Sequence, residues 1–173
     1  MVDIYNHNVA YAGFDRSVSA NFNYRSQWAG IDGQPNQVYV NAHLPVYLLN
    51  GGAGMRLSSD RSGGLAITEL MLSYNRVRSF NAGIVSVGAG FGWRQTGVDG
   101  SVIRTPEGVY VGGFSHEDPI LFNDSQLGSQ LSWSLALYTA TDWGDFGLSL
   151  NNLGGSRGNI SEINFSYPGT LDI

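Results

Sequence analysis

Three side chains that can ligate a metal or transfer a proton stand in a row at His116-Glu117-Asp118. A metal site needs ligands that converge from several directions, and adjacent residues of a loop seldom supply them without a further partner. We therefore interpret the row as solvated loop charge and predict no metal site. Because the chain contains no cysteine, thiolate ligands and disulfide bonds are excluded as well.

The other candidates for catalysis have simpler explanations. His43 falls on the polar face of an expected strand, where a hydrogen-bonded histidine is commoner than a general base. The glycine-rich run 88–92 imitates a nucleotide-binding loop, but no helix follows it to present N–H groups to phosphate. His7 belongs to a leading segment in which we expect it to be exposed. Since there is also no motif for a Ser-His-Asp triad, we predict a non-enzymatic protein without catalytic or cofactor-binding residues.

Several charged side chains occupy or end the polar faces of the expected strands. These residues are Arg25, Arg56, Glu69, Arg76 and Arg94. In a pore such charges can set ion selectivity, although more often they pair across the lumen. We retain four of them as predicted lumen charges: Arg56, Glu69, Arg76 and Arg94.

The composition is poor in charge and rich in glycine. Charged residues make up 13% of the chain, against about 25% in an average soluble domain, and the nine basic residues are all arginine. A net charge of -5 without a basic stripe argues against a nucleic-acid partner. The chain lacks both the apolar run of about 18 residues that a spanning helix needs and a signal-peptide pattern after Met1. We expect a mature or trimmed form of an exported protein.

The elements that position these residues are strands. Between residues 14 and 28 the apolar residues Val18, Phe22 and Tyr24 share one parity with Ala20, while serine, asparagine, arginine and glutamine occupy the other. Such period-two alternation indicates an extended strand with one apolar and one polar face. Comparable segments follow at 38–47, 53–58, 66–76, 85–94, 133–137, 146–151 and 162–167.

Residues 1–173 are predicted to form a single domain without helices, in which residues 1–13 lead into the first strand. The alternation fails over 95–130, which we interpret as a long loop insertion of the functional kind. The segment 85–94 places large apolar groups on one side and mostly glycine on the other. This pattern predicts a crowded or strongly curved inner surface.

Such a set of strands fits a β-sandwich, a soluble barrel or a transmembrane barrel. The polar faces carry serine, asparagine, glycine and threonine without any lysine, which suits a lumen better than open water. Aromatic residues gather at strand ends, as interfacial girdles do: Tyr24, Trp28, Tyr74, Phe91, Trp93, Trp143 and Tyr167. We predict an all-β, antiparallel, up-and-down transmembrane β-barrel, or the N-terminal part of one, with about eight strands surrounded by outer-membrane lipid.

The segment 8–47 also resembles the PorP/SprF family of outer-membrane proteins of Bacteroidota. The residues that carry the resemblance are Asn8, Ala10, Tyr11, Ala12, Gly13, Tyr24, Arg25, Gln27, Trp28 and Gly30, followed by the turn Asp32-Gly33-Gln-Pro35. Val9 stands where the family usually has proline. Members of the family are longer, and Leu171-Asp-Ile173 ends without a terminal aromatic residue. We therefore expect a partial chain that is incomplete at its C-terminus.

The resemblance implies a non-enzymatic component of the type IX secretion system and of gliding motility. Such a protein assists the secretion or surface anchoring of adhesins, with secreted surface adhesins and periplasmic secretion or motility proteins as partners. The alternative is a general porin or diffusion channel, in which the segment 95–130 constricts the pore. A barrel enzyme is disfavoured because the motifs it needs are missing.

Overall fold

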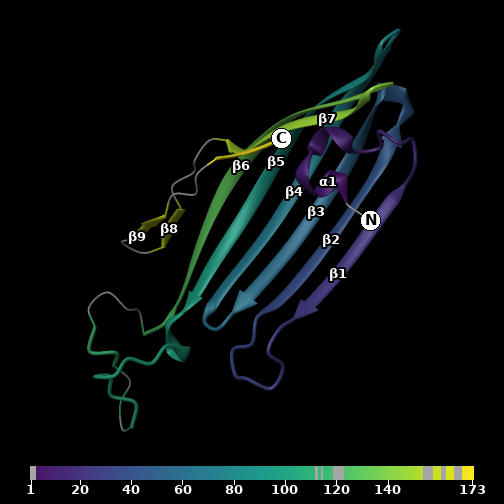
Figure 1. Ribbon diagram of the computed structural model, residues 1–173. Helices are drawn as coiled ribbons and strands as arrows, with labels where there is room; N and C mark the ends of the chain where they lie inside the picture. Colours follow the sequence, from purple (N-terminus) through teal and green to yellow (C-terminus); the bar gives the residue numbers. More distant parts are fainter. Residues whose placement is uncertain are drawn as a thin grey trace.

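The computed structural model describes residues 3–111, 113, 115–118, 123–153, 158–160, 163–165 and 169–173. It contains one antiparallel sheet of eight strands in the order β1-β2-β3-β4-β5-β6-β7-β10 (Figure 1). Neighbours in the sheet are successive along the chain as far as β7, so the topology is up-and-down. The predicted all-β fold with about eight antiparallel strands is confirmed. Among the described residues, β1 and β10 are the two edges of an open sheet.

The strands of the main sheet are β1 (Ser19–Ser26), β2 (Asn36–Val46), β3 (Gly51–Ser62), β4 (Leu65–Phe80), β5 (Gly83–Asp99), β6 (Ser125–Thr141), β7 (Gly144–Leu153) and β10 (Thr170–Asp172). The short 3-10 helices η2 (Tyr47–Leu49) and η3 (Gly100–Val102) lie in connections. A separate hairpin pairs β8 (Gly158–Ile160) with β9 (Ile163–Phe165). Among the described residues, no helix has the length and the apolar composition needed to span a membrane.

The boundaries of the predicted long loop were wrong. Residues 95–99 continue β5 and pair in register with residues 125–129 of β6, so the connection is 100–124. The backbone ladder persists there although the side chains no longer alternate between apolar and polar. The predicted last strand, 162–167, was wrong as well, because Ile163–Phe165 pairs with β8 while β10 completes the main sheet against β7. Glu162, Ser166 and Tyr167 lie outside the described residues.

The two faces of the sheet differ as the alternation predicted. Residues that pair directly across a ladder share a face. Leu72, Phe91 and Trp133 form one such row and are 37–54% exposed. One position along, Ser73, Gly90 and Ser134 form a row on the opposite face, where the two serines are buried. Apolar side chains therefore face outward, and small or polar ones face inward.

The N-terminal residues form a compact element, which the sequence did not predict. The helix α1 (Ile4–His7) and the 3-10 helix η1 (Val9–Tyr11) lie against the inner face of the sheet (Figure 1). We call Asp3–Ser17 the plug segment. Its residues Val9 and Ala10 pack with Met71, Ala136 and Tyr138 into the hydrophobic core cluster. The first strand therefore begins at Ser19, because the preceding residues belong to this segment and to a turn in which Arg16 is left-handed.

Candidate functional site

The plug segment occupies the hollow of a strongly curled sheet. Asp3 accepts hydrogen bonds from Asn21 of β1 and Asn41 of β2, while Asn8 Nδ2 donates to the carbonyls of Leu137 in β6 and Leu148 in β7. Because Ile4–His7 is helical and rises only about 1.5 Å per residue, Asp3 and Asn8 are roughly 8 Å apart along the chain, to which their side chains add only a few Å each. Seven flat strands, however, span about 29 Å from first to last. The sheet must therefore wrap around the plug segment, which makes the polar inner face concave.

Glycine residues on the concave face make room for the backbone of the plug segment. A Cβ atom added to Gly88 would lie 2.7 Å from Cα and 2.8 Å from N of Ala10. A Cβ atom at Gly54 would collide with the ring of Tyr5. The crowded inner surface predicted from the glycines of residues 85–94 is thus confirmed, and the crowding comes from the chain's own N-terminal residues.

Buried polar side chains of the sheet bind the main chain of the plug segment. Asn75 Nδ2 donates to the carbonyls of Ala10 and Ala12, the latter at 2.8 Å, and Ser86 Oγ donates to the Ala10 carbonyl at 2.6 Å. The N–H of Gly13 donates to His43 Nδ1 at 3.1 Å. The predicted hydrogen-bonded role of His43 is confirmed, and its acceptor role at Nδ1 leaves the proton on Nε2.

Aromatic rings also contact the plug segment, and we call the sheet residues that hold this segment, among them His43, Asn75, Ser86 and Tyr138, its seat. Tyr5 and His43 have ring centroids 5.1 Å apart, and Tyr138 lies 5.0 Å from Tyr11 and 4.9 Å from Phe14. The Tyr5 hydroxyl shares a hydrogen bond of 2.8 Å with Ser73. Burial raises the pKa of Tyr5 above its usual value near 10, and the bond to Ser73 opposes this shift only in part. The neutral phenol is therefore the form that the seat accommodates.

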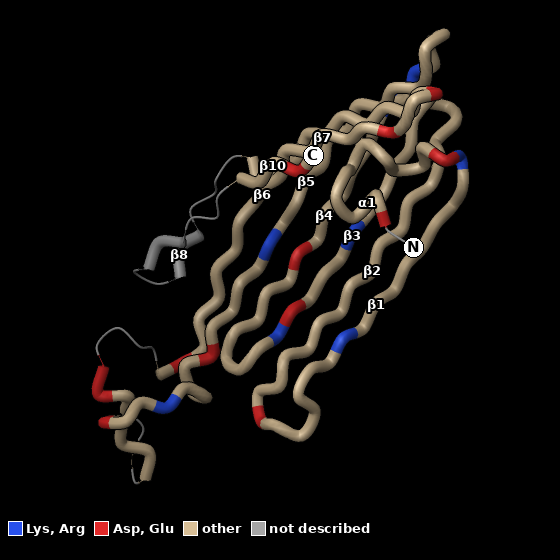
Figure 2. Tube along the Cα trace, in the orientation of Figure 1, with Lys and Arg blue, Asp and Glu red and all other residues tan. Residues whose placement is uncertain are grey.

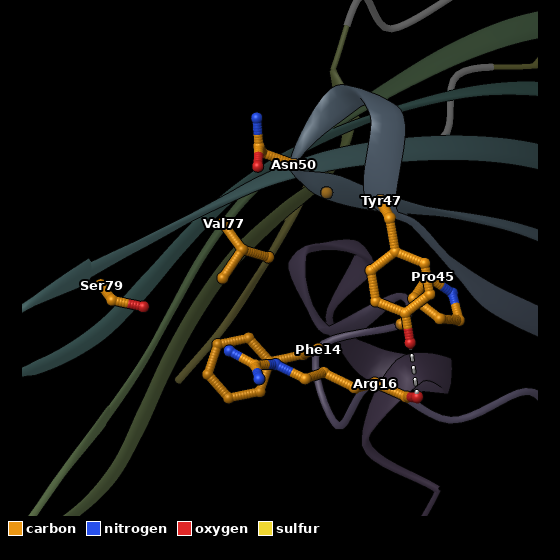
Figure 3. Close-up of a pocket in the computed structure, with 9 residues that line it drawn as sticks. Phe14, Arg16, Pro45, Tyr47, Asn50, Val77 and Ser79 are labelled. Atoms are coloured by element: carbon orange, nitrogen blue, oxygen red, sulfur yellow. Dashed lines mark hydrogen bonds between the residues drawn. The ribbon is translucent and has the colours of Figure 1, made fainter.

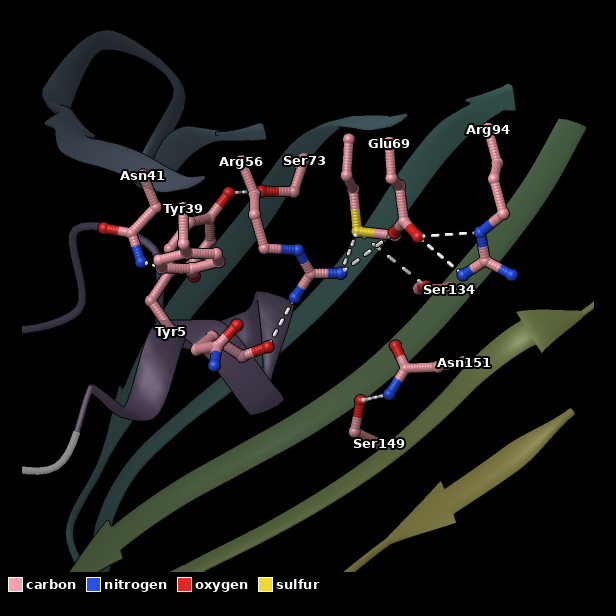
Figure 4. A network of polar contacts seen from close by, with 12 residues as sticks. Tyr5, Tyr39, Asn41, Arg56, Glu69, Ser73, Arg94, Ser134, Ser149 and Asn151 are labelled. Carbon is pink, nitrogen blue, oxygen red and sulfur yellow. Dashed lines mark hydrogen bonds and ion pairs between the residues drawn. The ribbon is translucent and has the colours of Figure 1, made fainter. Parts of the chain in front are cut away.

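Three of the predicted lumen charges meet below the plug segment. Glu69 on β4 stands directly opposite Arg94 on β5, and Arg56 on β3 lies on the same concave face, opposite Met71 (Figure 4). Figure 2 shows the corresponding basic, acidic and basic positions on three neighbouring strands. Arg94 donates to Glu69 Oε2 from Nε at 2.9 Å and from Nη2 at 2.5 Å, while Arg56 Nη2 lies 3.6 Å from Glu69 Oε1. The three side chains are 13–16% exposed. Arg56 also donates to the carbonyl of Asn6, which connects this charge cluster to the plug segment.

The prediction that Arg76 is a lumen charge was wrong. Arg76 pairs with Val87, which is 59% exposed on the outer face, and shares the parity of Leu72 and Tyr74. Arg76 therefore lies on the outer face of the sheet. Because Arg76 is near the end of β4, its charged side chain can be accommodated on this otherwise apolar face.

The residues of the sequence motif separate into two groups at opposite ends of β1. Asn8 to Gly13 lie in the plug segment. Tyr24 and Arg25 lie near the end of β1, whereas Gln27, Trp28 and Gly30 lie in the connection to β2. A hydrogen bond from the Gln27 N–H to the Pro35 carbonyl closes this connection. The second group does not touch the plug segment through any hydrogen bond found among the described residues.

Several cavities border the plug segment. One of about 350 Å³ lies at the charge cluster and is lined also by Tyr39 and by Asn151 and Asp172 of β7 and β10, which the sequence did not single out. Another of about 350 Å³ lies at the rim of the sheet, where Phe14 and Arg16 form one wall (Figure 3). The walls of both cavities thus include residues of the plug segment.

The histidines outside the seat differ from each other. His7 is exposed, as expected. His116 is 2% exposed, and its Nδ1 lies 3.1 Å from the Tyr110 hydroxyl, so its interpretation as solvated loop charge was wrong. Glu117 and Asp118 are exposed. Over the described parts of the chain, no group of three His, Cys, Asp or Glu side chains could hold a metal ion.

Comparison with protein-family models gives one result that covers nearly the whole chain. The model described as type IX secretion system membrane protein PorP/SprF matches residues 2–171. No curated protein and no solved structure matches the chain. The family match extends well beyond the segment 8–47 on which the motif residues stand.

Proposed function

Since the chain belongs to the PorP/SprF family of type IX secretion system membrane proteins, we propose that it is a multi-pass β-barrel component of the bacterial outer membrane. In this role it assists the secretion or surface anchoring of adhesins and contributes to gliding motility. Its partners are outer-membrane lipid, a secreted surface adhesin, and periplasmic secretion or motility proteins. The function requires no catalysis and no cofactor.

The observation that carries the membrane proposal is the inverted distribution of side chains. Large apolar residues of β1 to β7 are exposed on the convex face, among them Phe22, Leu72, Trp133 and Leu135. On the concave face, Asn41, Asn75, Ser86, Ser134 and Ser149 are almost completely buried. Exposure of so much apolar surface to water costs about 25 cal/mol for each Å². In a bilayer the same surface is solvated by lipid, and the backbone groups are satisfied by the ladder.

The lengths of the connections support one orientation of the sheet. The end beside the plug segment has the short connections 47–50, 81–82 and 142–143, whereas 27–35 and 100–124 lie at the other end together with the turn 63–64. In outer-membrane barrels the short turns are periplasmic and the longer loops extracellular. This rule places the plug segment toward the periplasm and the connection 100–124 toward the cell surface.

A general diffusion channel is the less favoured function. The plug segment and the charge cluster fill much of the concave face that a diffusion pathway would use. Conductance of the purified protein in planar bilayers separates the two functions. A secretion component of this build conducts poorly, whereas a steady open conductance at low voltage would favour the porin.

The secretion role is tested by deleting the gene and measuring adhesin on intact cells. We expect surface adhesin, detected by antibody or by protease shaving, to fall strongly and to return when the wild-type gene is restored. Unchanged surface adhesin in the deletion strain would overturn this role. The membrane location is tested separately, because the chain should remain in carbonate-washed outer membranes, and its extraction without detergent would refute the barrel.

A further inference from the structure

We propose that the concave face carries a peptide-binding site and that the plug segment is an exchangeable ligand of this site. The site consists of Gly88, Asn75, Ser86 and His43, with Gly52 beside them. Its ligand class is a short peptide in a turn conformation with small side chains at two alternate positions. This inference concerns binding within the folded chain and does not depend on the proposed role in secretion.

The first support is that the site contacts the peptide mainly through its main chain. The carbonyls of Ala10 and Ala12 and the N–H of Gly13 are all bound by side chains of the sheet. The three sheet residues that make these bonds, Asn75, Ser86 and His43, are 0–4% exposed. Asn75 is held in place in turn, because its Oδ1 accepts the Gly52 N–H at 2.5 Å. A site that binds main-chain groups in this way recognises a peptide conformation more than a set of side chains.

The second support is that the site leaves little room for the side chains of residues 10 and 12. Ala10 and Ala12 are 0% exposed, and the backbone at Ala10 lies directly over Gly88. A side chain larger than alanine at either position would have to displace the sheet backbone or its buried side chains. The site therefore selects small residues at these two positions. Asn8 adds a further element of selection, because its amide donates to the Leu137 carbonyl at 3.0 Å.

The third support is the way the plug segment is attached. The last residues of the plug segment, Asp15 to Ser17, lead through Val18 to β1 and are exposed. They are held by local hydrogen bonds from Ser17 to the Asp15 carboxylate and by one from the Tyr47 hydroxyl to the Arg16 carbonyl at 3.4 Å. Gly13 and Arg16 have left-handed φ values of 58°, so the chain changes direction just before this connection and again within it. The apolar part of the interface is confined to a few residues, which suits a ligand that can leave and return.

The test uses the complete chain with a specific protease site inserted at Ser17. The protein is folded, cleaved, and then incubated with a fluorescent synthetic peptide of residues 1–17. We expect the cleaved segment to co-purify with the sheet, and the labelled peptide to replace it with saturable binding. Loss of the segment on cleavage without rebinding would overturn the site, and permanent retention without exchange would overturn exchangeability.

Matched variants test the mode of recognition. A peptide with Ala10→Leu should bind roughly tenfold more weakly or worse, the change expected from overpacking a close contact. In the sheet, Gly88→Ala should weaken binding similarly. Gly90→Ala is its control on the same face of β5, because its added Cβ would lie 3.3 Å from Met71 Sδ and would meet Val9 of the plug segment only in an ordinary contact of 3.5 Å. If Gly88→Ala fails to fold, the peptide variant decides alone, and equal binding of both peptides would refute the inference.

Discussion

Replacement of Glu69 by glutamine should destabilise the fold by leaving two arginines without their shared carboxylate. Glu69 accepts two hydrogen bonds from Arg94 and lies 3.6 Å from Arg56. Breaking a buried ion pair by removal of one partner costs about 3–5 kcal/mol. Because this cluster lines a cavity of about 350 Å³ that water can enter, we expect the lower end of that range or slightly less, about 2–3 kcal/mol.

The assay is urea unfolding of the folded chain in phospholipid vesicles, followed by tryptophan fluorescence. With a slope of about 2 kcal/mol/M, the expected loss lowers the urea midpoint by roughly 1–1.5 M. The control is Arg76→Gln, since this exposed residue on the outer face should change stability by no more than about 0.5 kcal/mol.

A double-mutant cycle isolates the interaction itself. Arg94→Gln combined with Glu69→Gln should be less destabilising than the sum of the single changes, with a coupling energy of about 1 kcal/mol or more. A midpoint of Glu69→Gln equal to that of the wild type would refute the role of the cluster in stability. Strict additivity of the two changes would refute the direct coupling between these side chains.

Three further predictions concern the seat, the outer face and pH. Asn75→Leu removes three hydrogen bonds of about 1 kcal/mol each, so the amides of residues 8–13 should exchange with deuterium much faster than in the wild type. Unchanged exchange would contradict the role of Asn75 in holding the plug segment on the sheet. Leu72→Lys, at the middle of β4, should reduce folding into vesicles by about 2–4 kcal/mol, whereas Phe80→Lys, on the same face at the end of β4, should cost about 0–1 kcal/mol; equal effects would argue against a lipid-facing surface. Because the pKa of Tyr5 is raised, its contribution to stability is complete below pH 10 and is lost as the pH rises through the raised value. The urea midpoint should therefore fall more steeply there in the wild type than in Tyr5→Phe, in which other tyrosines of raised pKa still respond, and parallel curves would exclude this linkage.

The strands and their faces could be predicted because each strand carries its own signal. Alternation within β6, for example, separates Leu131, Trp133 and Leu135 from Ser132 and Ser134 without reference to any other strand. Such a signal weakens where the ladder extends beyond the apolar band, which is why both ends of the connection 100–124 were misplaced. The error at Arg76 is different, because its parity with Tyr74 already indicated the outer face while its charge suggested the inner one.

The seat of the plug segment could not be predicted, because its contacts join distant residues, from 30 positions apart for Gly13 and His43 to 140 for Asn8 and Leu148. Residues 8–13 have no alternation and are too short for a periodic signal. Two indirect signs were nevertheless present. Met71 interrupts a polar face, and it proves to pack against Val9, while the glycines of β5 leave space that some other part of the chain had to fill.

The plug segment also has a consequence for how the chain assembles. The segment comes first in the sequence, yet its binding groups lie on strands β2 to β7, so its site exists only after those strands have paired. A slip of one residue in β4 or β5 would present Tyr74 or Val87 in place of Asn75 or Gly88. The N-terminal residues can therefore dock only on a sheet in correct register. We therefore expect these residues to dock after the strands have paired, although they precede all of those strands in the chain.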